Sequence, residues 1–212
     1  MATTQTASST RLEAFDDATR ILIQTAAVVA TGSESDVRAI LARAQVGVPH
    51  IWIEELLLQT YLFAGFPRTL NALREWRRLV PTPAENAEII SDAGEWERRG
   101  RETCKRVYGA MYDRLRHNID GLHPAIDAWM IVEGYGKVLS RPGLDLGRRE
   151  LCIVAACVAS GQERQLHSHL HGALNVGVSA GVVRGALDEL RGVVSPALLE
   201  PAKLLFARVA GK

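Results

Sequence analysis

The stretch RRELCIVAACVASGQERQLHSHLHGALNVGV, residues 148–178, decides the fold of this 212-residue chain. It predicts a hairpin of two helices. Apolar residues recur at three- and four-residue steps between Glu150 and Ser160, which is the spacing of one helix face. Gly161 ends that helix, since glycine readily adopts the left-handed conformation of a helix C-terminus. Leucines at spacing four then predict a second helix over about residues 162–175.

Helical periodicity continues through the rest of the chain, and strand-like alternation is missing, so we expect an all-α fold. N-cap, glycine and proline signals set the helix ends; Ser33 with Asp36, for example, forms a near capping box. Thr82-Pro83-Ala84-Glu85 is another strong helix start. The other helices are expected at about residues 11–31, 33–45, 50–63, 66–79, 93–117, 123–139, 179–192 and from 196.

Composition excludes several classes of protein. The chain is 47% hydrophobic and 23% charged, with a net charge of +1, which is typical of a globular protein. The absence of a basic block argues against nucleic acid as a partner. Three cysteines fit a reducing compartment better than a disulfide framework. We find no apolar run long enough to span a membrane and no secretory signal, so we expect no membrane partner and a cytoplasmic location.

The chain also contains an internal repeat. A shift of 129 residues aligns Gly32 with Gly161, each after an apolar helix. After a one-residue gap, Val46-Gly47-Val48 aligns with Val176-Gly177-Val178. We therefore expect two related helical units in one chain. The expected segments are a flexible tail (1–12), a first, degenerate unit (13–80), a helical connector (81–122) and a second unit (123–212).

The run RPGLDLGRREL…GQERQLHSHLHGALNVGVS resembles the carboxymuconolactone decarboxylase family, whose superfamily includes the alkylhydroperoxidase AhpD group. Redox members of the superfamily carry Glu, then Cys-x-x-Cys, then His four residues after the second Cys. Glu150 and His169 match the Glu and the His, whereas Gln162 and Gln165 replace the two cysteines. A disulfide-cycling peroxidase needs two thiols within reach of each other. The resemblance therefore points to the decarboxylase branch and to an AhpD-like helical fold.

The resemblance implies loss of CO2 from a carboxylated muconolactone, without a cofactor, by a chain that assembles into a homo-oligomeric ring. His169 is our candidate proton donor, because histidine titrates near neutral pH. Glu150 would orient His169 or hold a proton; alternatively, the helix macrodipole simply favours a carboxylate at this helix start. The counterparts of this pair in the first unit are Ile21 and Ile40, so we place the candidate site in the second unit.

Further polar residues are candidate ligands of a small-molecule substrate. Arg141 and Arg149, or Arg148 in place of Arg149, could bind a carboxylate bidentately, although arginines on helix surfaces are often only solvated. The amides of Gln162 and Gln165 could hydrogen-bond a polar ligand, or both residues could simply lie on the surface.

His171 stands where the family often carries arginine, which suggests an anion-facing role. His167 and His171 are spaced as a possible metal pair, but a metal site needs at least a third ligand, and the sequence names none. We expect no metal. Cys152 and Cys157, five residues apart on one helix, are expected in the core.

Three functions remain open at this point, because a fold does not define a chemistry. The chain could be a lyase that decarboxylates a small carboxylated ring compound. It could be an AhpD-like peroxidase or oxidoreductase, which the missing Cys-x-x-Cys disfavours. It could also be a non-catalytic helical assembly protein or an enzyme that acts on another substrate.

Overall fold

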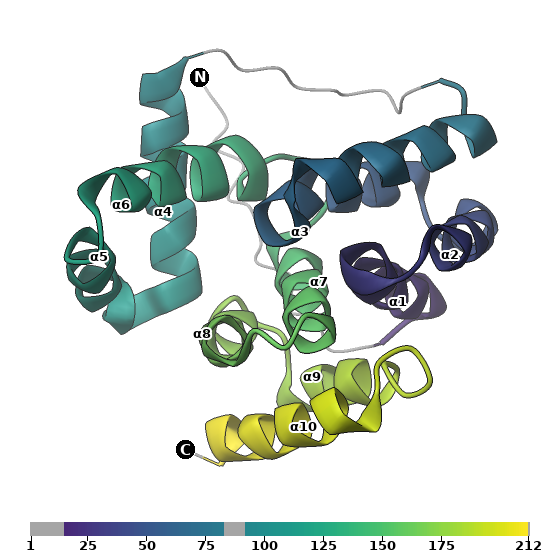
Figure 1. The fold of residues 1–212 in the computed structure, drawn as a ribbon. Helices are drawn as coiled ribbons and strands as arrows, with labels where there is room; N and C mark the ends of the chain where they lie inside the picture. Colours follow the sequence, from purple (N-terminus) through teal and green to yellow (C-terminus); the bar gives the residue numbers. More distant parts are fainter. Residues whose placement is uncertain (1–14, 83–91, 212) are drawn as a thin grey trace, which may run out of the picture.

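A computed structural model describes residues 15–82 and 92–211 and confirms the all-α prediction over these ranges. α7 (Leu146–Ala159) runs through the middle of the molecule, between α1 (Asp17–Thr31) and α8 (Glu163–Asn175) (Figure 1). Every residue of α7 except Arg148 is buried, which explains its almost continuously apolar sequence. No β-strand forms within the described ranges.

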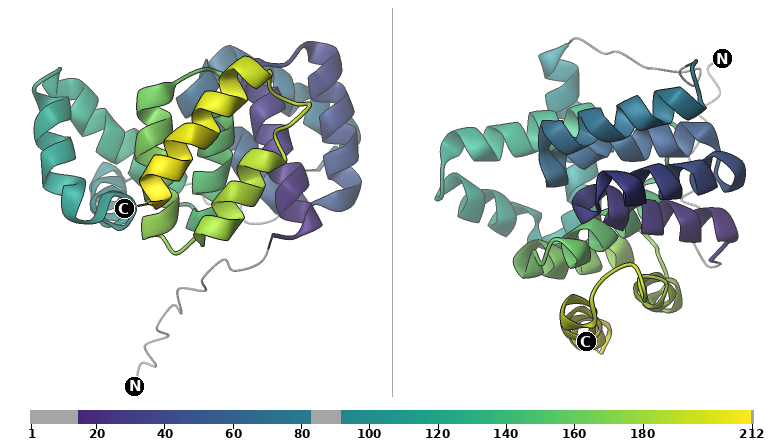
Figure 2. Two further views of the ribbon diagram at one scale, coloured as in Figure 1. Left: turned by 90° about the horizontal axis from the view of Figure 1, so that it is seen from below. Right: turned by 45° about the vertical axis from the view of Figure 1, so that its right-hand side comes forward.

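The other elements surround this central helix. α2 and α3 pack beside α1, α4 packs against the π-helix η2, and α9 and α10 close the far side of the α7–α8 hairpin (Figures 1 and 2). Their bounds are α2 (Glu34–Gly47), α3 (His50–Leu79), α4 (Ala93–Tyr108), the 3₁₀ turn η1 (Gly109–Met111), α5 (Tyr112–Asp120), α6 (Pro124–Trp129), η2 (Met130–Leu139), α9 (Ala180–Asp188) and α10 (Pro196–Ala210).

The predicted helix starts are confirmed at several places. Ser33 and Asp36 form a complete capping box at α2, and the Ser179 side chain caps α9. The break expected near residue 65 is a kink within α3, where Gly65 has a φ of 79°. The first helix begins at Asp17, because the Asp16 side chain accepts a hydrogen bond from the Thr19 backbone. The predicted start at residue 11 lies outside the described residues.

Two predicted helices differ in detail from the structure, and two further predictions concern residues that the structure does not describe. The single helix expected over 93–117 is interrupted at Gly109, whose φ of 54° lies in the left-handed region that favours glycine. The chain then passes through η1 into α5. The helix expected over 123–139 is present, but its second part is the π-helix η2. The tail 1–12 and the helix start at 83–85 lie outside the described residues.

None of the helices in the described parts of the chain is both long enough and apolar enough to cross a bilayer.

Candidate functional site

The α7–α8 hairpin brings Glu150 and His169 into direct contact. His169 Nδ1 lies 2.8 Å from Glu150 Oε2. Glu150 is fully buried and His169 is 6% exposed. Because α7 begins at Leu146, Glu150 lies beyond the first turn, where the macrodipole acts weakly. A buried carboxylate is costly unless a partner hydrogen-bonds to it, so the imidazole, rather than a helix end, stabilises Glu150.

A glycine makes room for this contact. Gly172 lies one turn after His169 on α8, and a Cβ atom at residue 172 would stand 2.6 Å from Glu150 Oε2 and 2.7 Å from Val107 Cγ1. Both distances are shorter than real Cβ contacts. A residue larger than glycine would therefore push the Glu150 carboxylate or α8 away from its present position.

The free atoms of the pair are the ones that can act on a ligand. If Glu150 is ionised, its carboxylate only accepts hydrogen bonds, and His169 Nδ1 is then the donor. Among the described residues, His169 Nε2 has no hydrogen-bond partner. It also differs from the few polar side-chain atoms that have no partner and are sealed off from solvent. It therefore reaches accessible space. Glu150 Oε1, in contrast, is enclosed and has no partner among the described residues.

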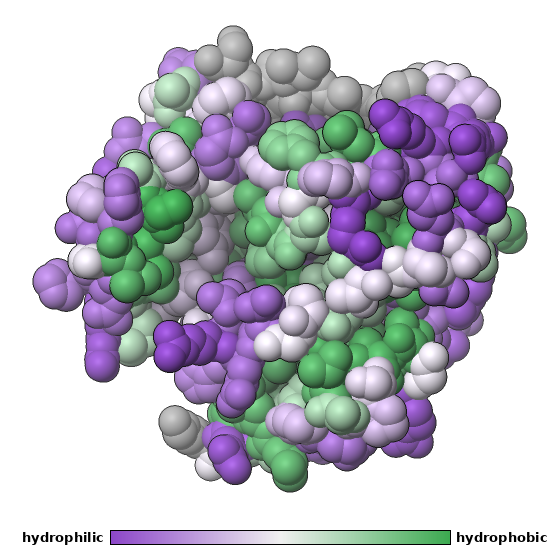
Figure 3. Space-filling view, viewed as in Figure 1, coloured by the Kyte–Doolittle hydropathy of each residue, from purple (hydrophilic) through white to green (hydrophobic). Residues whose placement is uncertain are grey.

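Aromatic residues from three other elements lie around the pair. Phe63 of α3 meets the His169 ring edge to face, with ring centroids 5.8 Å apart. Tyr108, at the end of α4, meets Tyr135 of η2 in the same manner at 6.2 Å. Burial raises the pKa of Tyr108 to about 12, against the opposing effect of a hydrogen bond with Tyr135 and with a smaller contribution from the Glu150 charge. Figure 3 shows that the surface is hollowed between α3, α6 and α8.

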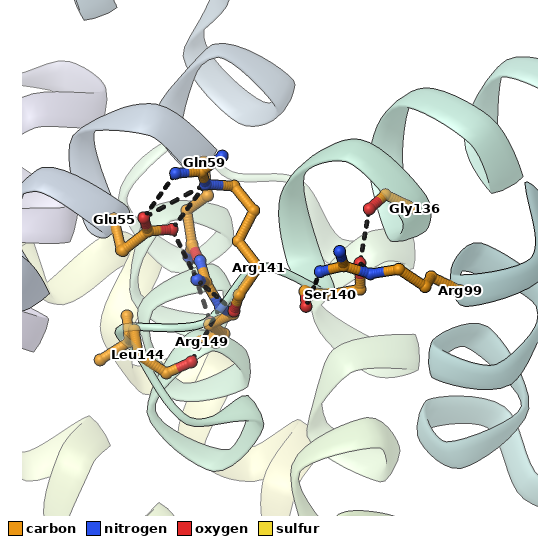
Figure 4. A network of polar contacts seen from close by, with 8 residues as sticks. All are labelled: Glu55, Gln59, Arg99, Gly136, Ser140, Arg141, Leu144 and Arg149. Atoms are coloured by element: carbon orange, nitrogen blue, oxygen red, sulfur yellow. Dashed lines mark hydrogen bonds and ion pairs between the residues drawn. The ribbon is translucent and has the colours of Figure 1, made fainter. Parts of the chain in front are cut away.

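The two arginines expected to bind a substrate carboxylate instead bind an internal one (Figure 4). Arg149 Nη2 lies 2.7 Å from Glu55 Oε2, and the Arg141 guanidinium contacts both oxygens of the same carboxylate at 3.0–3.2 Å. Arg149 also donates to Gln59 Oε1 and to the carbonyl oxygens of Leu144 and Arg141. Because Arg149 is fully buried, a substrate would have to displace Glu55 to reach it. The substrate-binding role of Arg149 stays a prediction, and it would require this displacement.

The alternative to Arg149, Arg148, is also held by the protein. Its guanidinium donates to Thr19 Oγ1 at 2.9 Å and pairs with Asp16 and Asp145. It also lies over the Trp52 ring, 4.2 Å from the centroid. Arg148 therefore ties α7 to the start of α1 and to Trp52 of α3.

The two glutamines at the redox positions lie apart from the pair. Gln162 and Gln165 are both exposed. They line a surface hollow together with Glu163, Arg164, His167 and Leu205, and this hollow includes neither Glu150 nor His169. This position matches the alternative that both glutamines lie on the surface, and their role as ligands of a substrate stays a prediction.

His167 and His171 form a pair of their own on α8. Their rings meet edge to face with centroids 4.9 Å apart. Among the described residues, no group of three or more His, Cys, Asp or Glu side chains is arranged to hold a metal ion. The third ligand that this pair would need is therefore not found in the described part of the chain.

The predicted core positions of Cys152 and Cys157 are confirmed. Cys104, Cys152 and Cys157 are all free and buried. Burial raises the pKa of Cys104 and of Cys157 to about 12, and it raises that of Cys152 as well. The thiolate is the form that reacts with peroxide. Thiols that stay protonated at neutral pH argue against a peroxidase.

The comparison with protein families agrees with this geometry. Residues 128–208 match the model of the carboxymuconolactone decarboxylase family. This segment belongs to that family. It contains α7 and α8 and therefore both members of the Glu150–His169 pair.

The name of a curated relative does not state a reaction. The chain is 31% identical to "Peroxisomal protein 2" of Schizosaccharomyces pombe over 140 residues, which are 63% of this chain and 64% of the relative. The chain thus spans less than two thirds of that relative. The comparison supports common ancestry with this protein, and it leaves the substrate of the decarboxylase-family segment open.

Three residues that lie near the candidate site were not predicted as site residues from the sequence. Glu55 stands in the apolar run IWIEELLLQ, where an acidic residue signals a buried charge that needs a partner. Phe63 stands at the predicted end of the helix over 50–63, where its apolar side chain gave no sign of a site. Tyr108 has no such signal, because it comes from the expected connector.

Proposed function

We propose that this protein is a cofactor-free lyase that decarboxylates a small carboxylated lactone or a related ring compound. His169 supplies the proton, and Glu150 holds the imidazole in place. The observation that carries the proposal is the buried contact of 2.8 Å between His169 Nδ1 and Glu150 Oε2, combined with the accessible Nε2 atom. Such a carboxylate fixes the tautomer and the orientation of the ring.

The reaction divides into two balanced steps. The bond between the ring carbon and the departing carboxylate breaks, CO2 leaves, and the electron pair moves into a conjugated carbonyl to form an enolate. The imidazolium of His169 then gives its Nε2 proton to carbon, and the neutral ring later takes a proton from solvent. Glu150, which accepts from Nδ1, stabilises the imidazolium throughout.

Turnover of 4-carboxymuconolactone, followed by CO2 release and ultraviolet absorbance, tests this function. We expect His169→Ala to lower kcat by roughly 10²–10⁴-fold, the usual contribution of a general acid. Glu150→Gln should also lower kcat, because an amide does not stabilise the imidazolium. His167→Ala is the matched control, since this exposed histidine lies on the same helix. Unchanged kcat in His169→Ala would refute the role, and an inactive wild type would refute this substrate.

We also propose a homo-oligomer in the cytoplasm, as expected from the resemblance. Large apolar side chains in the turn before α6 and on α6 itself are exposed, and contiguous exposed apolar surface often marks an interface. Leu122 is 78% exposed and Trp129 is 59% exposed. Light scattering during gel filtration measures the mass. A monomer at all concentrations would contradict the proposed assembly.

A further inference from the structure

One face of α3 lies against the α7–α8 hairpin. Glu55, Gln59 and Phe63 are spaced four residues apart, which places them on the same side of the helix. The Glu55 carboxylate binds Arg149 Nη2 at 2.7 Å, and the Gln59 amide donates to the Arg149 carbonyl oxygen at 3.3 Å (Figure 4). Arg149 directly precedes the glutamate of the candidate pair. One turn further along the same face, Phe63 meets the imidazole of that pair.

The imidazole of His169 has two neighbours of defined geometry. Its Nδ1 atom lies 2.8 Å from Glu150 Oε2, and the centroid of the Phe63 ring lies 5.8 Å from its own, with the two planes at 82°. The hydrogen bond fixes one atom of the imidazole. The plane of the ring remains to be set, because the χ2 torsion of histidine has only broad minima. An edge-to-face neighbour favours one orientation, so Phe63 supplies a restraint that the carboxylate does not.

The aromatic neighbours of Phe63 along α3 have a different partner. Tyr61 and Phe66, which stand on either side of it in the sequence, stack on each other with ring centroids 5.0 Å apart. The helix kinks between them at Gly65, whose φ of 79° is a conformation that residues with a side chain rarely adopt. The segment thus divides its aromatic rings, and the ring before the kink is the one that reaches His169.

We propose that Phe63 is a positioning residue, which sets the plane of the His169 imidazole so that Nε2 faces the ligand. The inference rests on the proposed function for the identity of the reaction, and on the ring contact for the restraint itself. It also gives the expected first unit, residues 13–80, a part in the site, because α3 lies within that segment. A unit without a polar pair of its own then helps to orient the histidine of the other unit.

The mobility of the His169 ring tests this restraint without any turnover. Carbon-13 relaxation of labelled histidine side chains in the full chain gives an order parameter for the ring C–H bonds. We expect a rigid ring in the wild type and a value in the flexible range, below about 0.6, in Phe63→Ala. Phe63→Tyr keeps an edge-to-face ring and should restore the wild-type value. Phe66→Ala is the matched control, since this exposed residue of the same helix stacks on Tyr61.

The variants at residue 63 are expected to fold. Phe63 is half-buried, so its truncation opens towards solvent and leaves no closed cavity in the core. Phe63→Leu is a second variant that keeps apolar bulk and removes the aromatic ring, and it should also loosen the imidazole. A His169 ring that stays rigid in both Phe63→Ala and Phe63→Leu would overturn the proposal. Equal loosening in Phe66→Ala would overturn it as well, because the effect would then be a general loss of rigidity in α3.

Turnover of 4-carboxymuconolactone provides the second arm. An edge-to-face ring pair contributes roughly two- to tenfold to the equilibrium that it biases. Phe63→Ala should lower kcat by about this factor, with a smaller change in KM, because the proton donor is misaligned, and Phe63→Tyr should restore kcat. If the wild type does not turn over this compound but Phe63→Ala loosens the His169 ring, the decarboxylase proposal fails and the positioning role stands. If the wild type is active and Phe63→Ala matches its kcat, the positioning role fails alone.

Discussion

Removal of the Glu55 carboxylate should destabilise the fold strongly. Glu55 is the acidic partner of Arg149, and both side chains are almost completely buried, with 2% and 0% exposed. In a Glu55→Ala variant the Arg149 guanidinium keeps Gln59 and two carbonyl oxygens as acceptors but loses its compensating charge. Arg141, which is 15% exposed, can turn towards water. The main cost therefore comes from Arg149.

The expected size of the effect follows from burial. Breaking a buried ion pair by removing one partner costs about 3–5 kcal/mol. For a domain of this length, each kcal/mol lowers Tm by about 2–4 °C. The variant should therefore melt about 6–20 °C below the wild type. A matched control is Glu97→Ala, since the Glu97–Arg101 pair is about half exposed on α4. Such a pair contributes about 0.3–0.5 kcal/mol, or roughly 1–2 °C.

Thermal melts followed by circular dichroism at neutral pH measure both variants. Glu55→Gln separates charge from shape, because glutamine keeps the size and one acceptor oxygen. It should lose most of the stability that Glu55→Ala loses. A Glu55→Ala protein that melts within a degree or two of Glu97→Ala would refute the argument that Glu55 compensates the Arg149 charge.

Two further predictions concern the surroundings of the pair. Gly172→Ala should be less stable than the wild type in urea, because overpacking costs about 1–3 kcal/mol against a helix-propensity gain of about 1 kcal/mol. Gly185→Ala, with only ordinary contact at 4.0 Å, should gain stability, and equal behaviour of the two would contradict the close approach at Gly172. Stability should also fall as pH rises from 9.0 towards about 12, because the folded protein keeps the protons of Cys104 and Cys157 that the unfolded chain releases. Thiolate absorbance of the folded protein near pH 9 would refute this second prediction.

The helical hairpin could be predicted because its signals are local. Leucine spacing, Gly161 and the N-cap at Ser179 each act within a few residues, and all three appear in the structure. Glu150 and His169 were singled out only because they match the Glu and the His of the family that the sequence resembles. Their contact depends on Gly172 and Val107, whose effect on the packing of α4 against α8 no periodicity reveals.

The arginines show what a local interpretation cannot supply, which is the identity of a distant partner. Arg141 and Arg149 stand near the candidate site in sequence, so a substrate carboxylate seemed a natural partner. Their carboxylate belongs to Glu55, which lies 94 residues before Arg149. Only the packing of α3 on α7 brings these charges together. A buried acid in an apolar helix was the available signal, and it shows that a partner is needed without identifying it.

Two surface hollows bear on the predicted internal repeat. The first is lined by Val29, Gly32, Glu34, Val37, Arg68, Asn71, Ala72, Arg74, Glu75 and Arg78. The second is lined by Cys157, Val158, Gly161, Gln162, Glu163, Leu166, Ala197, Leu198, Pro201, Ala202 and Leu205. The 129-residue shift carries the first four residues onto Val158, Gly161, Glu163 and Leu166. After the one-residue gap, it carries Arg68, Asn71, Ala72 and Glu75 onto Leu198, Pro201, Ala202 and Leu205.

This correspondence is consistent with the predicted repeat, because the alignment came from the sequence and the hollows depend on packing in space. The chemistry of the two hollows differs: the first has Arg68 and Glu75 where the second has Leu198 and Leu205. The same divergence places Ile21 and Ile40 opposite Glu150 and His169. Under the predicted repeat, the proposed activity therefore depends on the polar pair that only the second unit carries.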